Sequence, residues 1–347
     1  MKITKVTTLL IIVLVVFVLS ACVNNAPTQP QQTSTDLVEP ALLESSTPTT
    51  PVETQVIEES KNIFIHLEKS NYFFPDQTAL TQLSSSMTEM GYEVLSSIDL
   101  PGSEQSFSFA LLFEPSQETM SQFQSKNIEH FLVVQERGIV NFEKPTTFFE
   151  ISPADRLFIA GYLSALISND WRVGGLLPPI SYQNTTADKV FQNGVVFLCG
   201  RCAPTFGPIV KFPMSALLSN PEDNESTLQT YGEISTSKIN TLYIPSSYLF
   251  DDLVILLKQS GVTIVSDAIP GVDKSDWIDY AIVDNLSDLI LNAISETGPQ
   301  EGLVTTPVEF SIYATVRELS PGKSNFINDM IQNLQAGFIS PYQIPNE

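Results

Sequence analysis

The sequence predicts an α/β fold of two lobes, each built on an open parallel sheet that helices cover. Residues 147–151 are a short apolar run of strand composition. Residues 155–167 then carry apolar side chains at helical spacing, and residues 172–177 form a second apolar strand run. Strand, helix and strand in this order are the unit of a parallel sheet. The same alternation lies before and after this segment, which predicts two successive sheets with a cleft where their strand ends converge.

The first half of the alternation lies between residues 61 and 152. Apolar and aromatic runs predict strands at residues 62–67, 92–95, 107–113, 131–134 and 147–151. Helical composition predicts helices at residues 78–90 and 115–126, and Gly91 can end the first of them. Strands that alternate with helices in this way predict a parallel sheet with helices on its faces.

The second half restarts after Ser152 and Pro153, which suit the cap and the first turn of a helix. The predicted strands are residues 172–177, 208–212, 239–244, 262–265 and 280–283, and the predicted helices are residues 155–167, 186–198, 247–260 and 285–296. Gly161 lies inside the first of these helices, where glycine costs roughly 1 kcal/mol relative to alanine. Gly174 and Gly175 lie inside a strand run, and no Lys-Ser/Thr of a phosphate-binding loop follows them. We therefore expect close backbone packing at all three glycines.

The N-terminus has the pattern of a bacterial lipoprotein signal. Lys2 and Lys5 precede an apolar run at residues 9–19, and the tetrad Leu-Ser-Ala-Cys that ends at Cys22 looks like a lipobox. We therefore expect residues 1–22 to be a signal peptide, with a fatty acid such as palmitate on Cys22 as the membrane anchor. An ordinary secretory signal or a single anchoring helix is the alternative. The expected location is the bacterial cell membrane, facing outside the cytoplasm.

Residues 23–60 are expected to be a disordered tether. They are rich in Thr, Ser, Pro and Gln and show no hydrophobic periodicity, so they cannot bury enough apolar surface to offset the entropy of ordering. The whole chain has a net charge of −22, from 17 basic and 39 acidic residues. Only six of the acidic residues lie in the tether, so the part from residue 61 onward is also strongly acidic. This charge argues against nucleic acid as a partner and against adhesion to an anionic bilayer.

Three stretches carry a resemblance to a known family: residues 148–178, residues 262–267 and the C-terminal IQNLQAGFISPYQIP at residues 331–345. In amino-acid sequence these stretches resemble the basic membrane protein (BMP) family of substrate-binding lipoproteins. The resemblance implies the type I periplasmic-binding-protein fold, in which crossover strands join two Rossmann-like lobes and form a hinge. The lobes it implies are residues 61–152 with about 285–316, and residues 153–284 with about 317–347.

The resemblance also implies a function. The family supplies solutes, notably nucleosides, to membrane transporters, so the chain would be a lipid-anchored substrate-binding protein of an ABC-type uptake system. Its ligand would be a nucleoside or a similar small polar molecule, enclosed when the lobes close about the hinge, and an ABC permease would bind the closed form.

One loop departs from the family pattern. The family usually carries an aspartate, paired glycines and a Ser-Phe-Asn after the first strand. Here Ile65 or His66 takes the aspartate position, and residues 66–76 contain no glycine. This departure leaves an alternative function open. The chain would then be a degenerate binding-protein fold that acts as a surface sensor or interaction lipoprotein without a transported ligand.

The candidate ligand-binding residues are polar and aromatic side chains that follow predicted strands. They are Tyr72, Phe73, Phe74, Glu136 and Arg137 in the first half, and Tyr182, Ser246, Ser247, Tyr248 and Asp267 in the second half. Phe74 can stack on a planar ligand. Asp267 matches a family aspartate that accepts hydrogen bonds from ligand hydroxyls. The structural alternatives are core packing for one of the rings at 72–74 and a turn cap for Asp267.

No catalytic or metal-binding constellation stands out. Cys199 and Cys202 form a CxxC, which fits a redox pair, half a metal site or a local disulfide. In an oxidising exterior compartment a structural disulfide is favoured, and zinc would need more ligands. His66 and His130 are well separated in the sequence, so we expect them at strand ends or on the surface rather than in a triad. We therefore expect no enzyme activity, no cofactor and no metal.

Overall fold

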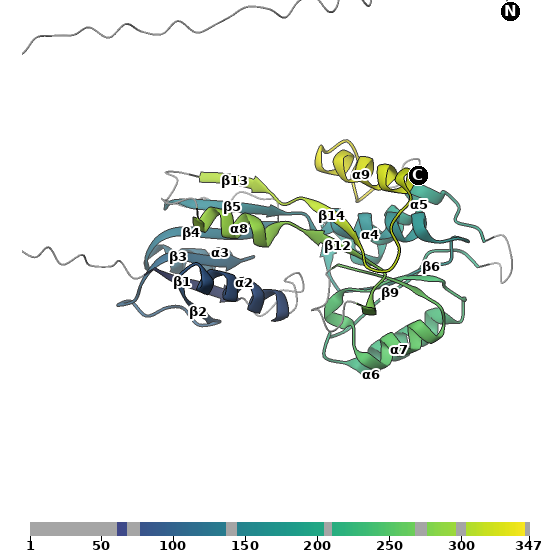
Figure 1. Cartoon of the computed structure of the whole chain (residues 1–347), viewed down its shortest axis with the longest axis horizontal. Coiled ribbons are helices and arrows are strands. Elements are labelled where there is room, and N and C mark those ends of the chain that lie inside the picture. Colours follow the sequence, from purple (N-terminus) through teal and green to yellow (C-terminus); the bar gives the residue numbers. More distant parts are fainter. Residues whose placement is uncertain are drawn as a thin grey trace, which may run out of the picture. The chain divides into compact units, whose positions relative to one another are not determined.

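The first of two six-stranded sheets, sheet A, has the strand order β13-β5-β4-β3-β1-β2 (Figure 1). Its strands are β1 (Asn62–Leu67), β2 (Glu93–Ser97), β3 (Ser106–Phe113), β4 (Asn127–Glu136), β5 (Thr146–Ile151) and β13 (Leu303–Pro307). Every neighbouring pair in this order is parallel. The computed structural model describes residues 61–67, 77–136, 144–204, 210–267, 276–295 and 303–343.

Helices cover both faces of sheet A. Ile63 and Ile65 of β1 lie in one hydrophobic cluster with side chains of α2 (Gln77–Glu89) and α8 (Leu286–Ser295). Phe64, which lies between them in the sequence, belongs to a second cluster with α3 (Gln117–Gln124). Successive side chains of a strand point to opposite faces. A sheet that is buried on both faces therefore needs the continuous apolar runs from which the strands were predicted.

The second sheet, sheet B, has the order β14-β12-β11-β10-β6-β9. Its strands are β6 (Val173–Leu177), β9 (Met214–Leu217), β10 (Thr241–Tyr243), β11 (Thr263–Ser266), β12 (Tyr280–Asp284) and β14 (Phe310–Ala314). The pairs are parallel except for β12 with β14. A small hairpin, β7 (Ser181–Tyr182) and β8 (Thr185–Thr186), follows β6. Gln183 and Asn184 form its turn with φ of 45° and 68°, the left-handed geometry of a tight hairpin turn.

Five helices and one 3₁₀ turn surround sheet B in the described ranges. They are α4 (Pro153–Ile167), α5 (Ala187–Cys199), α6 (Asn224–Ser235), η1 (Ser246–Tyr248), α7 (Asp251–Gln259) and α9 (Pro321–Gln335). In Figure 1, α4, α5 and α9 lie on one side of the sheet, and α6 and α7 lie on the other.

Glycines let α4 and α5 approach each other closely. A Cβ atom on Gly161 of α4 would overlap the backbone carbonyl oxygen of Phe191, and a Cβ atom on Gly194 of α5 would overlap that of Phe158. In β6, a Cβ atom on Gly174 would lie 2.8 Å from Ile239 Cδ1, and one on Gly175 would lie 2.7 Å from Phe191 Cε1. The expected close packing is confirmed at all three predicted glycines.

The chain passes between the sheets three times. β5 leads into α4 at Ser152, β12 leads into α8 at Asn285, and β13 leads into β14 at residues 308–309. Asn285 N–H donates to Glu309 O at 3.2 Å, and Val308 N–H donates to Glu150 O at 3.0 Å. The three crossings are therefore bonded to one another, and neither sheet is one continuous piece of chain.

The predicted α/β class with two parallel-sheet lobes is confirmed, while three details differ. Residues 310–314, expected to stay with the first lobe until about 316, pair with β12 in sheet B. The described part of the strand expected at residues 208–212 is not a strand. β9 follows it at Met214–Leu217, after Pro213, which lacks the N–H that a ladder needs. Helix α6 was not predicted, because its sequence is largely polar and buries only a narrow face.

Both histidines are buried in sheet A. His66 lies at the end of β1, one of the two positions expected, whereas His130 lies inside β4, and neither is on the surface. Each is 4% exposed. The ring of His66 packs edge-on against Phe123 with centroids 5.2 Å apart. His130 Nε2 is 2.9 Å from Thr147 Oγ1, and burial lowers the pKa of His130. The reason is that helices cover both faces of sheet A, so a strand residue on either face is shielded from water.

Candidate functional site

Polar side chains lie at the carboxyl ends of strands in both sheets. In sheet A, Glu114 follows β3 directly and Glu136 is the last residue of β4. In sheet B, Tyr243 ends β10, Asp267 follows β11 and Asp284 ends β12. The carboxyl ends of parallel strands share one edge of an open sheet, and ligands bind outside that edge in α/β folds. These residues therefore mark the edge at which each sheet can contribute to a site.

Three carboxylates near this edge interact with one another. Burial raises the pKa of Glu114, and the carboxylate of Glu136 raises it further. Burial also raises the pKa of Glu136, and Asp155 in the first turn of α4 adds to the rise. Tyr342, close to the C-terminus, has its pKa raised to about 12 by burial and by the charges of Glu136 and Asp155. Like charges raise a carboxyl pKa when they lie close together, so this region is a concentrated acidic surface.

Tyr182, which follows a strand of sheet B, interacts electrostatically with the carboxylates of sheet A. It lies in the hairpin that follows β6, and its side chain is buried. Burial raises the pKa of Tyr182, Tyr243 and the two carboxylates Glu136 and Glu114 raise it further, and Arg156 opposes them. Tyr182 of the second lobe is thus within electrostatic reach of carboxylates of the first. We name Glu114, Glu136, Asp155, Tyr182 and Tyr342 the inter-sheet cluster.

The backbone of Glu114 has a conformation that is rare for its residue type. Its φ is 40°, and its N–H donates to Val134 O at 2.7 Å. A non-glycine residue in this region costs on the order of 1–3 kcal/mol and persists only where the surrounding structure holds it. Such strain concentrates at ligand sites. The conformation therefore supports a functional role for the carboxylate that Glu114 presents after β3.

Arg156, one turn into α4, is the buried cation nearest to this cluster in the sequence. It is 8% exposed and forms an ion pair with Asp284, and its guanidinium carbon lies 5.6 Å from the ring centroid of Phe310. Burial alone would lower the pKa of Arg156, but the carboxylates of Asp284 and Asp267 outweigh it and the pKa is raised. Arg156 Nε has no hydrogen-bond partner among the described residues. A charge this deeply buried is stable only because Asp284 is fixed beside it.

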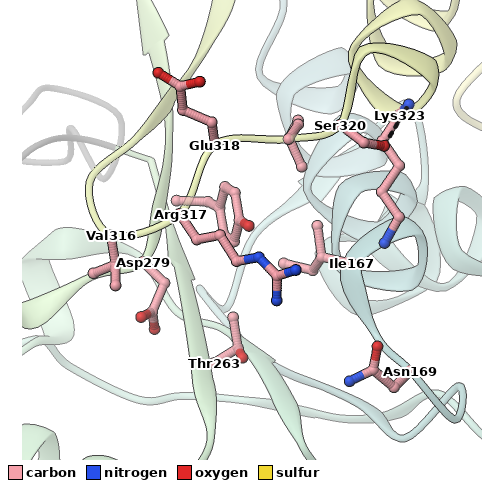
Figure 2. A pocket seen from close by; sticks show the side chains of 11 residues that line it. Ile167, Asn169, Thr263, Asp279, Val316, Arg317, Glu318, Ser320 and Lys323 are labelled. Atoms are coloured by element: carbon pink, nitrogen blue, oxygen red, sulfur yellow. Dashed lines mark hydrogen bonds between the residues drawn. The ribbon is translucent and has the colours of Figure 1, made fainter.

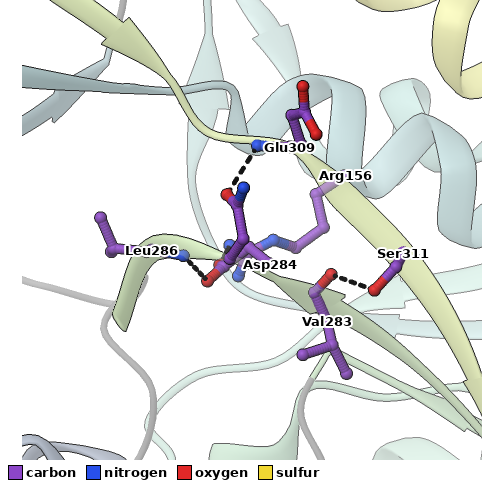
Figure 3. A network of polar contacts seen from close by, with 7 residues as sticks. Arg156, Val283, Asp284, Leu286, Glu309 and Ser311 are labelled. Carbon is purple, nitrogen blue, oxygen red and sulfur yellow. Dashed lines mark hydrogen bonds and ion pairs between the residues drawn. The ribbon is translucent and has the colours of Figure 1, made fainter. Parts of the chain in front are cut away.

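The ion pair belongs to a polar network at the crossings, which Figure 3 shows. Asp284 Oδ1 also accepts a hydrogen bond from Leu286 N–H at 3.2 Å, at the start of α8. Asn285 Oδ1 accepts one from Glu309 N–H at 3.0 Å, and Ser311 Oγ donates to Val283 O at 3.4 Å. Arg156 therefore joins the crossing before α4 to the crossing before α8. Asp155 of the inter-sheet cluster is its neighbour in the sequence.

The structure brings together Ser246 and Asp267 of the predicted site. Asp267 Oδ1 accepts a hydrogen bond from Ser246 N–H at 2.8 Å, so one of its oxygens is engaged by η1, the 3₁₀ turn that follows β10. Tyr248 is 1% exposed and packs in the core of sheet B, while Ser247 is exposed. Of the other predicted site residues, Tyr182 and Glu136 belong to the inter-sheet cluster. Five lie outside the described residues: Cys22, Tyr72, Phe73, Phe74 and Arg137.

A disulfide joins Cys199, the last residue of α5, to Cys202. Gly200 lies between them with φ of 63°, a conformation that glycine adopts without strain. Among the described residues, no group of three His, Cys, Asp or Glu side chains could hold a metal ion. Within the same ranges, no helix has both the length and the apolar character to span a bilayer.

Several residues of this region were not predicted from the sequence. They are Glu114, Asp155, Arg156, Tyr243, Asp284 and Tyr342. Glu114 and Asp284 carried a usable signal, because each stands at the end of a correctly predicted strand. Arg156 carried a weaker one, as a single cation in a helix that is apolar on nearly all sides. Tyr342 carried none, because only the folded chain brings the C-terminal segment to the cluster.

No family model and no curated protein matches the sequence. The structure is similar to that of a transcriptional activator of the comK gene from Bacillus halodurans, with a TM-score of 0.53, 13% identity, and coverage of 82% of this chain and 99% of that chain. It is also similar to an ABC transporter solute-binding protein from Conexibacter woesei (0.53, 12%, 82% and 98%) and to another from Aeropyrum pernix (0.54, 11%, 83% and 94%). At these identities the likeness concerns the fold. The chain has the two-lobed α/β fold of the periplasmic solute-binding proteins.

Proposed function

We propose that the protein is a lipid-anchored, extracytoplasmic solute-binding protein of an ABC-type uptake system. The observation that carries this proposal is the inter-sheet cluster, in which side chains of both lobes interact at the carboxyl ends of the strands, beside the three crossings. A ligand held there would contact both lobes at once. Closure of the lobes about the crossings would then enclose it, and a permease would bind the closed form.

The chemistry of the cluster suggests a ligand that donates hydrogen bonds or carries positive charge. Its carboxylates, Glu114, Glu136 and Asp155, are acceptors when ionised, and hydrogen bonds to an ionised group are the stronger kind. Sugar hydroxyls are donors of this type. A nucleoside, or a similar small polar molecule with several hydroxyls, is therefore the ligand class we propose, and a planar base would stack on the aromatic rings predicted at residues 72–74.

We further propose that the chain is a member of the BMP family with its anchor at Cys22. The amino-acid sequence of residues 148–178, 262–267 and 331–345 supports membership of the family. The lipobox-like tetrad supports a lipid anchor at Cys22. The fold shared with two structures titled ABC transporter solute-binding proteins is consistent with this role. The site of action would be the outer side of the bacterial cell membrane.

Calorimetry on the purified full chain against a nucleoside panel tests the ligand. Glu136→Gln removes one charged acceptor but keeps the shape of the side chain, and losing a charge-assisted hydrogen bond typically costs about 1.5–3 kcal/mol. We therefore expect affinity to fall roughly ten- to a hundredfold. The matched control is Glu233→Gln on α6, which removes one exposed carboxylate elsewhere and should leave affinity unchanged.

A second candidate function is a surface sensor or interaction lipoprotein without a transported ligand. The loop at residues 66–76, which lacks the glycines usual in the family, favours it. The same titration separates the two candidates. If no nucleoside binds even at millimolar concentration, the uptake function loses its main support and the sensor takes its place.

A further inference from the structure

A pocket of about 510 Å³ opens at the amino ends of the strands of sheet B (Figure 2). Thr263 and Tyr280, the first residues of β11 and β12, form part of its wall. Tyr182 of the inter-sheet cluster follows the carboxyl end of β6, which runs parallel to β11 through β10. The pocket and the inter-sheet cluster therefore lie at opposite edges of the same sheet. The remaining wall comes from the end of α4 and from residues 316–320 with the start of α9.

Two cations in this wall have no ion-pair partner among the described residues. They are Arg317 and Lys323. The wall also holds two carboxylates, but Asp279 is already engaged: it accepts from Lys258 Nζ at 3.2 Å and from Ile264 N–H at 2.7 Å. In Figure 2 the carboxylate of Glu318 points away from the guanidinium of Arg317. The wall therefore offers Arg317 and Lys323 to an anion, beside one carboxylate that is engaged and one that points away, in a chain whose net charge is −22.

Arg317 is an exposed residue of the wall, and its charge reaches the buried side chain of Tyr280 on the same wall. Burial raises the pKa of Tyr280, and Arg317 lowers it because a nearby cation favours the phenolate. A concave wall of one sign concentrates the electrostatic potential and attracts ions of the other sign. The N-terminus of α9 also lies in this wall, with Ser320 as its cap, and the positive end of the helix dipole adds to the same field.

The side chains of the wall suit a small organic anion. The planar fork of Arg317 can bind two oxygens of a carboxylate or phosphate at once, and Lys323 can add a second positive charge. The Asn169 amide and the Thr263 hydroxyl, which also line the pocket, can donate further hydrogen bonds. Ile167 and Leu319 offer an apolar surface to a short carbon chain. The volume is in the range of pockets for small molecules.

We propose that this pocket is a second ligand site that binds a small dianion, either a phosphate monoester or a dicarboxylate. Arg317 and Lys323, which form no ion pair within the described residues, match two negative charges, and a neutral sugar or nucleoside lacks these charges. The site is independent of the function proposed above, because it shares no residue with the inter-sheet cluster.

Calorimetry with glycerol 3-phosphate and with succinate on the purified full chain tests the proposal, with glycerol as the neutral probe. We expect saturable binding of at least one dianion and none of glycerol. Arg317→Gln and Lys323→Gln should each weaken that binding by about tenfold or more, the scale of one charge-assisted hydrogen bond. Lys189→Gln, which removes an exposed cation from α5, is the matched control and should have no effect.

The ratio of the two affinities identifies the anion class, and a preference for either probe supports the proposal. Three results would overturn it: neither dianion binds saturably, glycerol binds as well as the dianions, or Lys189→Gln weakens binding as much as Arg317→Gln. A loss of dianion binding in Glu136→Gln would also overturn it, because the anion would then depend on the inter-sheet cluster. Failure of nucleosides to bind has no bearing on these outcomes, so the two proposals can fail separately.

Discussion

At the scale of single residues, Arg156 and Asp284 form a buried ion pair, in which two charges are removed from water. The side chain of Arg156 is 10% exposed and that of Asp284 is 21% exposed, so the two partners do not lose the same hydration. Breaking a buried pair is costly mainly because the remaining charge stays buried without compensation. The cost must therefore depend on which partner is removed.

We expect Asp284→Asn to lower the free energy of unfolding by about 3–5 kcal/mol, because it leaves the guanidinium of Arg156 buried beside a neutral amide. Arg156→Met should cost less, since Asp284 is the more exposed partner and keeps its hydrogen bond from Leu286 N–H. Urea unfolding of both variants measures the difference. The control is Lys258→Met, which breaks the more exposed pair with Asp279 and should cost no more than about 1 kcal/mol. Equal losses in the two buried variants would contradict this account.

The carboxylates of the inter-sheet cluster predict an unusual pH dependence. The pKa values of Glu114 and Glu136 are raised in the folded protein, so the folded chain holds more protons than the unfolded chain above the ordinary glutamate pKa of about 4.3. Their contribution to stability is complete below that pH and is lost as the pH rises through the raised pKa values. Glu136→Gln should therefore raise the melting temperature at neutral pH and flatten its decline from about pH 4 to pH 8.

The overall negative charge also weakens the fold as the pH rises, so the comparison needs a variant that removes the same charge elsewhere. Glu233→Gln on α6 serves as that control. Melting curves of the two variants and the parent across the pH range should separate Glu136→Gln from the other two. Identical curves for the two variants would show that Glu136 has no special environment.

At the scale of elements, the contact of α4 with α5 is held by two glycines that face backbone rather than flexible side chains. Gly161→Ala and Gly194→Ala should each destabilise the protein by about 3 kcal/mol, the upper end of the usual range for overpacking, because a carbonyl oxygen has to move. Thermal unfolding measures the loss. Gly232→Ala is the control, since a Cβ atom on this helical glycine of α6 has open space around it. That variant should be neutral or more stable by up to about 1 kcal/mol.

The same scale shows how far the sequence predicts the fold. Every strand of sheet A except β13, and most helices, were predicted, because elements buried between layers need long apolar runs or strong helical periodicity. Helix α6 was missed because it touches sheet B through few side chains and is otherwise polar. The third crossing was placed too late because β13 and β14 form one nearly continuous strand-like run. Composition cannot say at which residue such a run leaves one sheet for the other.

The candidate site was less predictable than the fold. The sequence placed Glu136, Tyr182 and Asp267 after strands, where the structure has them, since position at a carboxyl edge follows from the order of elements. The coupling of Glu114, Asp155 and Tyr342 depends on how the crossings bring distant segments together. No local pattern encodes such distances.

At the scale of the whole molecule, the proposed anchor determines where the protein acts. We expect a fatty acid on Cys22 and cleavage after Ala21, because Cys22 ends an apolar run and begins a polar, acidic segment. Metabolic labelling with a fatty acid should mark the wild-type chain and fail to mark Cys22→Ala. Cys199→Ser, which lies in the disulfide after α5, is the control and should keep the label. Persistent labelling of Cys22→Ala would reject the anchor.

The three crossings also set the order in which the fold can be completed during synthesis. Sheet A begins first in the chain, yet α8 and β13 follow most of sheet B. Until they arrive, the apolar face that holds Ile63 and Ile65 is covered by α2 alone, and β5 keeps an unpaired edge. A bare face and an open edge are the features that lead nascent chains to pair wrongly. A chaperone that shields β5 until residues 303–307 emerge would therefore protect the edge of sheet A that this topology completes last.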